Sequence, residues 1–186
     1  MAYLSRDELE KMGFASVGET VFISDKASIY GAERITLGNN IRIDDFCVLS
    51  AGTGGIVIGD YVHIAVFSLL IGAGEIVLSD FSTLSSRVSV YSSSDDYSGE
   101  YMTNPTVPAE FTNVNHGDVL IGRHVVIGSG SVILPESIIH DGVAVGALSL
   151  VNNICHEFGI YAGVPAKRIK ERQRKLLNIA DIANLK

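Results

Sequence analysis

The residues best suited to move a proton lie together in one polar segment, between Tyr91 and Leu120. This segment contains two adjacent carboxylates, Asp95 and Asp96, and a histidine, His116. Imidazole and carboxylate groups are common general bases in enzymes. We expect His116 to be the base because it is the histidine of this segment. The alternative is that Asp95 or Asp96 orients a bound molecule, or acts as the base if burial raises its pKa.

A second feature is a cluster of basic residues near the C-terminal end. Of the 14 Lys and Arg residues in the sequence, six lie between Lys167 and Lys175. The sequence after Pro165 predicts a helix over 166–186, and a helix N-terminus adds unpaired N–H groups to the charge of nearby lysines. The cluster, with Lys167 and Lys170, therefore indicates a phosphate site. The alternative is a solvated basic face of the helix.

A six-residue repeat supplies the scaffold that must position these groups. Aliphatic anchors recur at every sixth position, and in the last six repeats the residue four places after each anchor is small or β-branched. An α-helix has no such period, and an ordinary β-sandwich would not keep this phase across insertions. The repeat therefore predicts a solenoid of stacked coils. The anchors are Ile23, Ile29, Leu37, Ile43, Leu49, Ile58, Ile64, Leu70, Leu78, Leu84, Val90, Ile121, Ile127, Ile133, Ile139, Val145 and Val151.

The insertions in this repeat fall at regular intervals, with three repeats between most of them. If three hexapeptides form one turn of a triangular prism, every insertion projects from the same corner, and so does the long loop at 91–120. Parallel strands about 4.8 Å apart then give roughly five to six turns over residues 21–165. Glycine, asparagine and aspartate directly after the anchors suit the corners because they tolerate positive φ. The longer steps run from 29 to 37, 49 to 58, 70 to 78 and 90 to 121.

The two ends of the solenoid need covers, because a bare end coil exposes its apolar interior. Ser5 and Glu8 form a capping box, and Gly13 provides a stop, which predicts a helical cap within residues 1–20. The helix expected over 166–186 can cover the other end with an apolar stripe. The chain is thus expected to consist of a cap, a β-helix with an inserted loop, and a C-terminal helix.

Three short segments of the repeat region carry a family resemblance. They read Ile-Gly-Ser-Gly-Ser-Val-Ile-Leu-Pro at 127–135, Val-Gly-Ala-Leu-Ser-Leu-Val at 145–151 and Ala-Gly-Val-Pro-Ala-Lys at 162–167. Over roughly residues 20–175 the chain resembles the hexapeptide-repeat acyltransferases, among them the galactoside, maltose and xenobiotic O-acetyltransferases. The resemblance implies a left-handed parallel β-helix that assembles as a homotrimer. It also implies an enzyme that transfers acetyl from acetyl-CoA to a hydroxyl of a sugar or glycan precursor.

The resemblance also implies that acetyl-CoA binds in the groove between two neighbouring prisms. Ser129 and Ala147 would line the pantetheine path, with Asn152 nearby, because small side chains let this thin arm approach the backbone. The alternative interpretation of these three residues is corner and core packing. Lys167 and Lys170 take the positions at which the family holds the CoA phosphates.

The match with the family fails at the catalytic residue. In the family a histidine of the extended loop is the base, and this chain has Asp95 or Asp96 in its place. One alternative is therefore N-acetylation of a nucleotide-linked amino sugar, because an unprotonated amine attacks a thioester without a side-chain base, and relatives with this activity can lack the histidine. An alternative of another class is a non-catalytic solenoid scaffold. A polar loop of about 30 residues favours a site for a polyhydroxylated ligand over a scaffold.

A metalloenzyme is a weaker alternative. The γ-type carbonic anhydrases share the prism, but they bind zinc through histidines brought together at one interface, and this sequence has no His-x4-His pair. No metal is expected. The remaining histidines, His63, His124, His140 and His156, fall on repeat strands or corners, which indicates surface or interface roles.

Bulk properties exclude several other classes. The net charge is −7 and the isoelectric point is near 5.1, so nucleic-acid binding, which needs a broad basic face, is not expected. The sequence lacks a run of roughly 18 apolar residues and the features of a signal peptide, which favours a cytoplasmic protein without membrane insertion. The two cysteines, Cys47 and Cys155, are too few for a disulfide framework and are expected to stay reduced.

Overall fold

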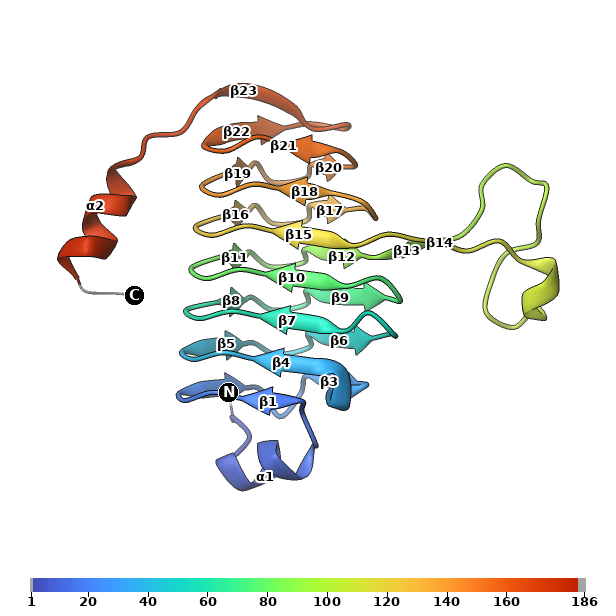
Figure 1. Ribbon diagram of the computed structural model, residues 1–186, viewed down its shortest axis with the longest axis horizontal. Helices are drawn as coiled ribbons and strands as arrows, with labels where there is room; N and C mark the ends of the chain where they lie inside the picture. The colour runs from blue at the N-terminus through green and yellow to red at the C-terminus, as the bar shows by residue number, and fades with distance from the viewer. Residues whose placement is uncertain (1, 184–186) are drawn as a thin grey trace.

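The computed structural model describes residues 2–183, and its body is a column of short parallel strands (Figure 1). The strands lie in three sheets of seven, eight and six members, and the chain passes from one sheet to the next around a triangular prism. Within these sheets, neighbouring parallel strands are one full coil apart in the sequence. The predicted parallel solenoid is confirmed, with about seven turns in place of the five to six expected.

The strands of the prism follow one another in a fixed order. The first sheet contains β1 (Ser16–Val17), β4 (Ile35–Leu37), β7 (Ile56–Ile58), β10 (Ile76–Leu78), β15 (Val119–Ile121), β18 (Ile138–Ile139) and β21 (Ile154–Cys155). The second contains β2 (Val21–Ile23), β5 (Ile41–Ile43), β8 (His63–Ile64), β11 (Thr83–Leu84), β16 (Val126–Ile127), β19 (Ala144–Val145), β22 (Gly159–Ala162) and β23 (Lys167–Glu171). The third contains β3 (Ser28–Tyr30), β6 (Val48–Ala51), β9 (Leu69–Gly72), β12 (Ser89–Tyr91), β17 (Val132–Ile133) and β20 (Leu150–Val151).

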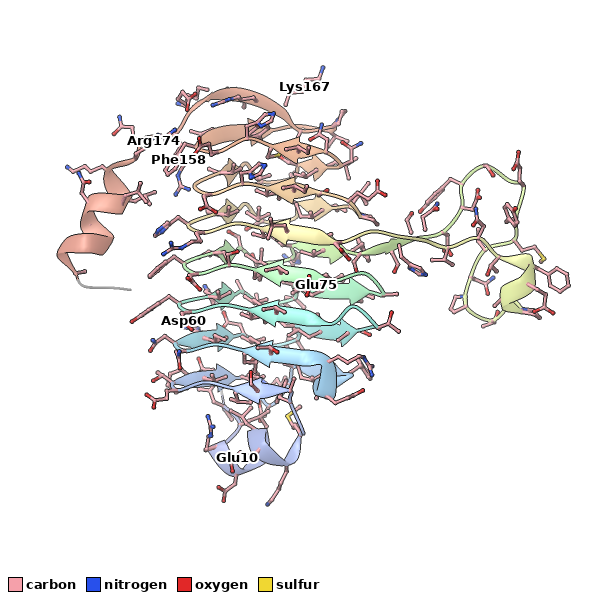
Figure 2. All side chains as sticks on the ribbon, viewed as in Figure 1. Glu10, Asp60, Glu75, Phe158, Lys167 and Arg174 are labelled. Carbon is pink, nitrogen blue, oxygen red and sulfur yellow. The ribbon has the colours of Figure 1, made fainter. Side chains whose placement is uncertain are left out.

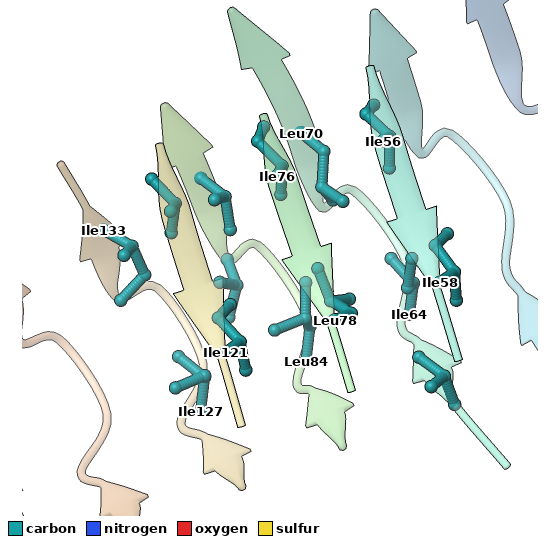
Figure 3. Packing of buried hydrophobic residues seen from close by; sticks show 14 of the residues in the cluster. Ile56, Ile58, Ile64, Leu70, Ile76, Leu78, Leu84, Ile121, Ile127 and Ile133 are labelled. Carbon is teal, nitrogen blue, oxygen red and sulfur yellow. The ribbon is translucent and has the colours of Figure 1, made fainter. Parts of the chain in front are cut away.

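The aliphatic anchors of the repeat fill the interior of the prism. All the predicted anchors are buried except Ile29, which is half-buried against the core. Ile58, Leu78 and Ile121 stack in register on consecutive strands of the first sheet (Figure 3). The smaller residues predicted four places after the anchors are also buried, so large and small side chains alternate inside the prism. The smaller residues are Val125, Ser131, Ser137, Val143, Ser149 and Cys155.

At the corners between the first and second sheets, the glycine after the anchor has a different role from the predicted one, which was to adopt a positive φ. The residue with positive φ is the third after the anchor. At most of these corners it is not glycine, as with Tyr61 and His124, each with a φ of 57°, whereas after Ile139 it is Gly142. The glycine directly after the anchor is needed for close approach, because a Cβ on Gly59 would lie 2.4 Å from Oδ1 of Asp80. That same oxygen accepts the backbone N–H of Asp60 at 2.9 Å, at the corner labelled in Figure 2. A corner hydrogen bond thus fastens one coil to the next.

The N-terminal cap is a short helix, α1 (Arg6–Lys11). The predicted capping box is present, with the Ser5 side chain accepting from the backbone of Glu8 and the Glu8 side chain accepting from the backbone of Ser5. Leu9 is buried and joins the core of the prism. The helix therefore covers the first coil. Met1 lies outside the described residues.

The C-terminal segment differs from the helix predicted over 166–186. Lys167–Glu171 form β23, which runs antiparallel to β22, and the helix α2 spans Lys175–Ile182. Strand pairing prevails here because the last parallel strand of the second sheet would otherwise leave an edge of unpaired N–H and C=O groups. Residues 184–186 lie outside the described part of the chain. No helix within the described residues has the length and apolar character needed to cross a membrane.

The insertions project from the corner between the third and first sheets, as predicted. The longest, residues 92–118, forms an arm that leaves after β12 and returns at β15 (Figure 1). At its base β13 (Ser93–Ser94) pairs antiparallel with β14 (Asn115–His116), and η2 (Ala109–Phe111) lies farther out. A shorter insertion at the same corner contains η1 (Ala32–Arg34). One corner of the prism therefore carries the segment that contains the candidate bases.

Candidate active site

The base of the arm holds the histidine predicted to be the base. His116 is exposed on β14, and its Nδ1 lies 2.8 Å from Oγ of Ser93 on β13. Oγ of Ser93 also accepts the backbone N–H of Ala73 at 2.8 Å. If Ser93 donates its proton to Nδ1, Nε2 carries the other proton and the neutral ring has no free lone pair; if Nδ1 is the donor, Nε2 is free to accept. His116 is therefore available as a base in only one of its two neutral tautomers.

A hollow of about 500 Å³ lies between the base of the arm and residues 104–114 farther along it. Asp95, Ser93 and Ser94 contribute a carboxylate and two hydroxyls to its walls. A mainly apolar hollow with a few polar groups is typical of small-molecule sites. Asp95 therefore faces a space in which a ligand can bind. The apolar part of the lining comes from Ile71, Pro105, Val107, Ala109 and Val114.

Asp96 has a structural role within the arm. Its Oδ1 accepts the backbone N–H of Ser98 at 2.6 Å, and its Oδ2 accepts Nδ2 of Asn113 at 2.9 Å. The hydrogen bonds from Ser98 and then from Asn113 stabilise the charged form and lower the pKa of Asp96 below its ordinary value. A carboxylate with a lowered pKa is a weaker base. The geometry therefore favours Asp95 over Asp96 as the reactive carboxylate.

Ser129 and Ala147 lie on consecutive coils at the corner between the second and third sheets, where both are exposed. Each follows a glycine, and a Cβ on Gly128 would lie only 2.4 Å from the backbone N of Ala147. The neighbouring Leu148 is 74% exposed. At Ser129 and Ala147 the corner presents small side chains and backbone to solvent, as a narrow ligand path requires, and Leu148 adds a large apolar side chain beside them.

Asn152 lies at a different corner. It is exposed directly after β20, between the third and first sheets, on the same corner as the arm. Within one chain it is therefore not beside Ser129 and Ala147, whereas the family resemblance implies that the three residues line a groove between two neighbouring prisms. The phase of the repeat explains the difference, because Asn152 follows a third-sheet anchor, Val151, whereas the other two residues follow second-sheet anchors.

Lys167 and Lys170 are exposed on β23 at the upper end of the prism, where Figure 2 labels Lys167. They lie on a strand and not at a helix N-terminus, so the part of the phosphate prediction that relied on helix N–H groups is wrong. The positive charge remains, since Arg168 between them is exposed as well. Flexible lysines can hold a phosphate as point charges.

A second hollow, of about 660 Å³, lies near the corner that carries His140 and His156. The two imidazoles stack with ring centroids 6.3 Å apart. The charged side chains that line this hollow partly neutralise one another, because Arg168 forms an ion pair with Glu171. Among residues 2–183 no group of three His, Cys, Asp or Glu side chains is arranged to hold a metal ion.

One cluster was missed by the sequence analysis. On the outer face of the second sheet, the buried Asp44 accepts Nε of Arg42 at 2.7 Å and meets Nε2 of His63 at 2.9 Å. His63 was expected to have only a surface or interface role. Arg42 and His63 come together because they are direct partners on β5 and β8. The signal that could have found them is the length of one coil, the 21 positions from 42 to 63.

Known proteins resemble the chain over most of its length, although no family model matches it. It is 57% identical over 182 residues to a dTDP-4-amino-4,6-dideoxy-D-glucose acyltransferase of Escherichia coli, a match that covers 98% of this chain and 95% of the relative. It is 32% identical over 157 residues to a candidate lipopolysaccharide biosynthesis O-acetyl transferase, WbbJ, of Escherichia coli, which covers 81% of this chain and 75% of the relative.

A solved structure agrees with these relatives. AntD, an N-acyltransferase from Bacillus cereus solved in complex with dTDP and 3-hydroxybutyryl-CoA, matches with a TM-score of 0.93 and 45% identity, covering 98% of this chain and 96% of that one. The fold is therefore the left-handed parallel β-helix that the resemblance implied, and the prediction of an acyltransferase is confirmed over the non-catalytic scaffold. The chain belongs to the hexapeptide-repeat family of sugar acyltransferases.

Proposed function

We propose that this enzyme transfers the acyl group of acetyl-CoA, or of another short acyl-CoA, to the 4-amino group of a dTDP-4-amino-4,6-dideoxyhexose. Two relatives support a nucleotide-linked amino sugar as the acceptor. The relative from Escherichia coli is a dTDP-4-amino-4,6-dideoxy-D-glucose acyltransferase, and AntD is an N-acyltransferase solved with dTDP and an acyl-CoA. They favour N-acylation, which the sequence left open as an alternative, over O-acetylation of a hydroxyl.

The observation that carries this proposal is the composition of the hollow beside the arm. Among the described residues that line it, the titratable group is the carboxylate of Asp95, accompanied by the hydroxyls of Ser93, Ser94 and Thr112 and the amide of Asn104. A carboxylate attracts an ammonium group and accepts its proton, whereas a sugar hydroxyl is a far weaker acid and needs a stronger base. An amine acceptor therefore fits this hollow better than a hydroxyl acceptor.

The proton balance of the reaction gives Asp95 a defined role. It binds the ammonium form of the acceptor and takes one proton, which leaves a neutral amine with a free lone pair. The amine attacks the thioester carbonyl carbon and forms the C–N bond. The tetrahedral intermediate then breaks its C–S bond, and the second proton on nitrogen passes to the departing sulfur. The products are the amide and the CoA thiol, and Asp95 returns its proton to solvent.

His116 acts in this scheme as a positioning residue. Its hydrogen bond to Ser93, at 2.8 Å, ties together the two strands at the base of the arm. Asp95 follows β13 directly. A secure pairing of β13 with β14 therefore keeps the carboxylate pointed into the hollow.

The donor is proposed to lie along the corner formed by Ser129 and Ala147. The small side chains of that corner leave room for pantetheine, and the basic Lys167 and Lys170 lie farther up the prism, where the CoA phosphates would be held. Asn152 lies on another corner, so it reaches this path only from a neighbouring prism. The donor site is therefore proposed to form between two copies of the chain.

We propose a homotrimer, as in the family, and the outer surface of the first sheet supports a subunit interface. Leu120 and Ile154 point outward there and are 37% and 48% exposed. A continuous apolar strip of this kind is typical of a subunit interface. The strip contains Val57, Val77, Leu120, Ile138 and Ile154, which are consecutive partners in the sheet.

The cysteines are in keeping with a reducing compartment, and we propose a cytoplasmic location. Cys47 and Cys155 are both free and buried. Burial raises the pKa of each thiol to about 11, so neither is a ready nucleophile. Free thiols are typical of cytoplasmic proteins.

Acyl transfer tests the proposal directly. The purified enzyme is mixed with acetyl-CoA and dTDP-4-amino-4,6-dideoxyglucose, and release of the CoA thiol is followed together with the mass of the sugar product. Matched acceptors are the same nucleotide sugar with a 4-hydroxyl group, free galactosides and maltose. We expect rapid turnover of the amine alone. Turnover of the hydroxyl sugars without turnover of the amine would show that the proposed acceptor is wrong.

A further inference from the structure

The cluster on the outer face of the second sheet has the features of an anion site. Asp44 is 5% exposed, and its two oxygens receive Nε of Arg42 at 2.7 Å and meet Nε2 of His63 at 2.9 Å. A buried carboxylate that holds two side chains in this way fixes their orientation, as the supporting partner of a ligand-binding histidine does. Among the described residues, the Nη atoms of Arg42 and Nδ1 of His63 have no hydrogen-bond partner and remain available.

These available atoms suit a phosphate group. The guanidinium edge of arginine matches two phosphate oxygens. A protonated imidazole donates from both nitrogens, so Nδ1 of His63 adds a further donor in that form while Nε2 donates to Asp44. The side chains of Arg42 and His63 are 51% and 39% exposed, so a ligand can reach them, while the Asp44 side chain is only 7% exposed. Asp44 is therefore a positioning residue, and the other two form the contact surface.

An aromatic pair lies next to this cluster. Phe22 is the direct strand partner of Arg42, and its ring centroid is 5.3 Å from that of Tyr3. Both rings are exposed, Phe22 by 46% and Tyr3 by 38%. Exposed aromatic rings are stacking platforms for nucleobases. Because Phe22, Arg42 and His63 occupy consecutive strands, the platform and the last donor are about 10 Å apart, a span that suits a nucleoside diphosphate lying along the prism.

Phe22, Arg42 and His63 form a strip on the outer face of the second sheet, distinct from the apolar strip of the first sheet. The position of this strip relative to the arm requires a second copy. The next strand partner of His63 is Thr83, in the coil from which the arm leaves. The arm, however, projects from the corner between the third and first sheets, which is opposite the second sheet. One chain therefore cannot bring Asp95 to the strip, whereas the arm of a neighbouring prism can.

We propose that Arg42 and His63, oriented by Asp44, bind the diphosphate of the nucleotide-sugar acceptor. The base stacks on Phe22 and Tyr3, and the sugar points up the prism toward the arm of a neighbouring copy. This inference rests on the proposed function, from which the acceptor class is taken. In this arrangement the lower coils of the prism hold the acceptor and the upper coils hold the acyl donor. The two substrates meet at the level of the arm.

Binding of dTDP alone to the intact enzyme, measured by calorimetry, tests the strip. We expect Arg42→Gln to weaken dTDP about tenfold or more and His63→Ala several-fold, as for lost charge-assisted hydrogen bonds. Asp44→Asn keeps both donors and should also weaken dTDP, while the KM for acetyl-CoA stays unchanged in all three variants. Arg123→Gln is the matched control, because Arg123 is also 51% exposed and lies 3.7 Å from Asp80, but at a corner away from the strip. Unchanged dTDP affinity in Arg42→Gln and His63→Ala, or no dTDP binding by the wild type, overturns the inference.

Subunit mixing tests the role of the neighbouring copy. Arg42→Gln and Asp95→Asn enzymes are dissociated, mixed and reassembled, and activity is measured at a low acceptor concentration. Mixed assemblies pair an intact arm with an intact strip and should recover activity that neither variant has alone. No recovery would show that the arm and the strip of different copies do not act together.

The outcomes for the strip and for the proposed function can be told apart. If the wild type binds dTDP and the variants do not, but the wild type forms no acylated sugar, the proposed function is wrong and the dTDP site on the strip is retained. If the sugar is acylated and Arg42→Gln leaves its KM unchanged, the strip fails and the proposed function stands.

Discussion

Ser93 and His116 are joined across the base of the arm by a hydrogen bond of 2.8 Å. The same Ser93 hydroxyl accepts the backbone N–H of Ala73, which belongs to the coil below. One side chain therefore connects both strands of the arm to the prism. Asp95 lies two residues beyond Ser93, so the geometry of the proposed reactive carboxylate depends on this junction.

The carboxylate of Asp95 should be the most sensitive group in the reaction. We expect Asp95→Asn to lower kcat about 10²- to 10⁴-fold, because an amide cannot accept the proton of the ammonium group. The KM for acetyl-CoA should stay unchanged in steady-state assays. Asp96→Asn is the neighbouring control and should have a much smaller effect on kcat. A kcat for Asp95→Asn within a few-fold of the wild type would exclude Asp95 as the proton acceptor.

The role of His116 can be separated from that of a base by comparison with its partner. We expect His116→Ala to lower kcat by less than about tenfold and no more than Ser93→Ala does, because Ser93→Ala removes the shared hydrogen bond together with the one from Ala73. The double variant should lose little beyond Ser93→Ala. The measurement is a double-mutant cycle on kcat and on the acceptor KM. A much larger loss in His116→Ala than in Ser93→Ala would show that the imidazole itself takes part in proton transfer.

The basic residues of β23 should affect the donor alone. We expect Lys167→Ala to raise the KM for acetyl-CoA roughly three- to tenfold, as for loss of one charged phosphate contact, and Lys170→Ala to act in the same direction. The acceptor KM should not move. Lys11→Ala, at the opposite end of the prism, is the control. An unchanged KM for acetyl-CoA in both variants would remove β23 from the donor site.

The hydrogen bonds of Asp96 should make the arm sensitive to acid. Because the pKa of Asp96 is lowered in the folded state, its bonds stabilise the arm fully above the ordinary aspartate pKa, and this stabilisation is lost as the pH falls through the lower folded value. We expect the protection factor of the Ser98 amide, which is the intrinsic hydrogen-exchange rate divided by the observed rate at the same pH, to fall as the pH drops below about 4. Asp96→Asn should lack this step. A step of equal size in Asp96→Asn would assign the acid response to another group.

The apolar strip of the first sheet should control assembly. We expect Leu120→Glu to convert the proposed trimer into smaller species, because a buried unpaired carboxylate is strongly unfavourable at an interface. Light scattering coupled to size exclusion measures the mass. Val164→Glu is the control, since Val164 is 72% exposed at the upper end of the prism. A trimer that persists in Leu120→Glu would place the interface on another face.

The core could be predicted from the sequence because the repeat links each buried position to its neighbours. Anchors such as Ile121 are buried on every coil, and a six-residue period leaves little choice of which side chain faces inward. The first strand was missed although Val17 lies six residues before the anchor Ile23, because β1 is only two residues long and its Val17 is half-buried. The helix predicted around Lys167 failed for a different reason: local pattern was outweighed by an open strand edge that only the assembled prism creates.

The candidate site was less predictable because its residues are far apart in the sequence and come into contact only when successive coils stack. The phase of the repeat already separates Asn152 from Ser129, since they follow anchors of different sheets. The contact of Asp44 with His63 needs the exact length of a coil, which one added residue would change. Side-chain partners such as those of Asp96 depend on loop conformation, for which residue type alone gives no rule.

The closure of the arm has an evolutionary consequence. The backbone N–H of Gly117 donates to the carbonyl of Ser92 at 3.1 Å, so the two ends of the arm meet at the surface of the prism. A segment closed in this way can be lengthened, shortened or exchanged without altering the register of the strands above and below it. New acceptor preferences can therefore arise by replacement of this module, while the donor-handling framework is inherited intact.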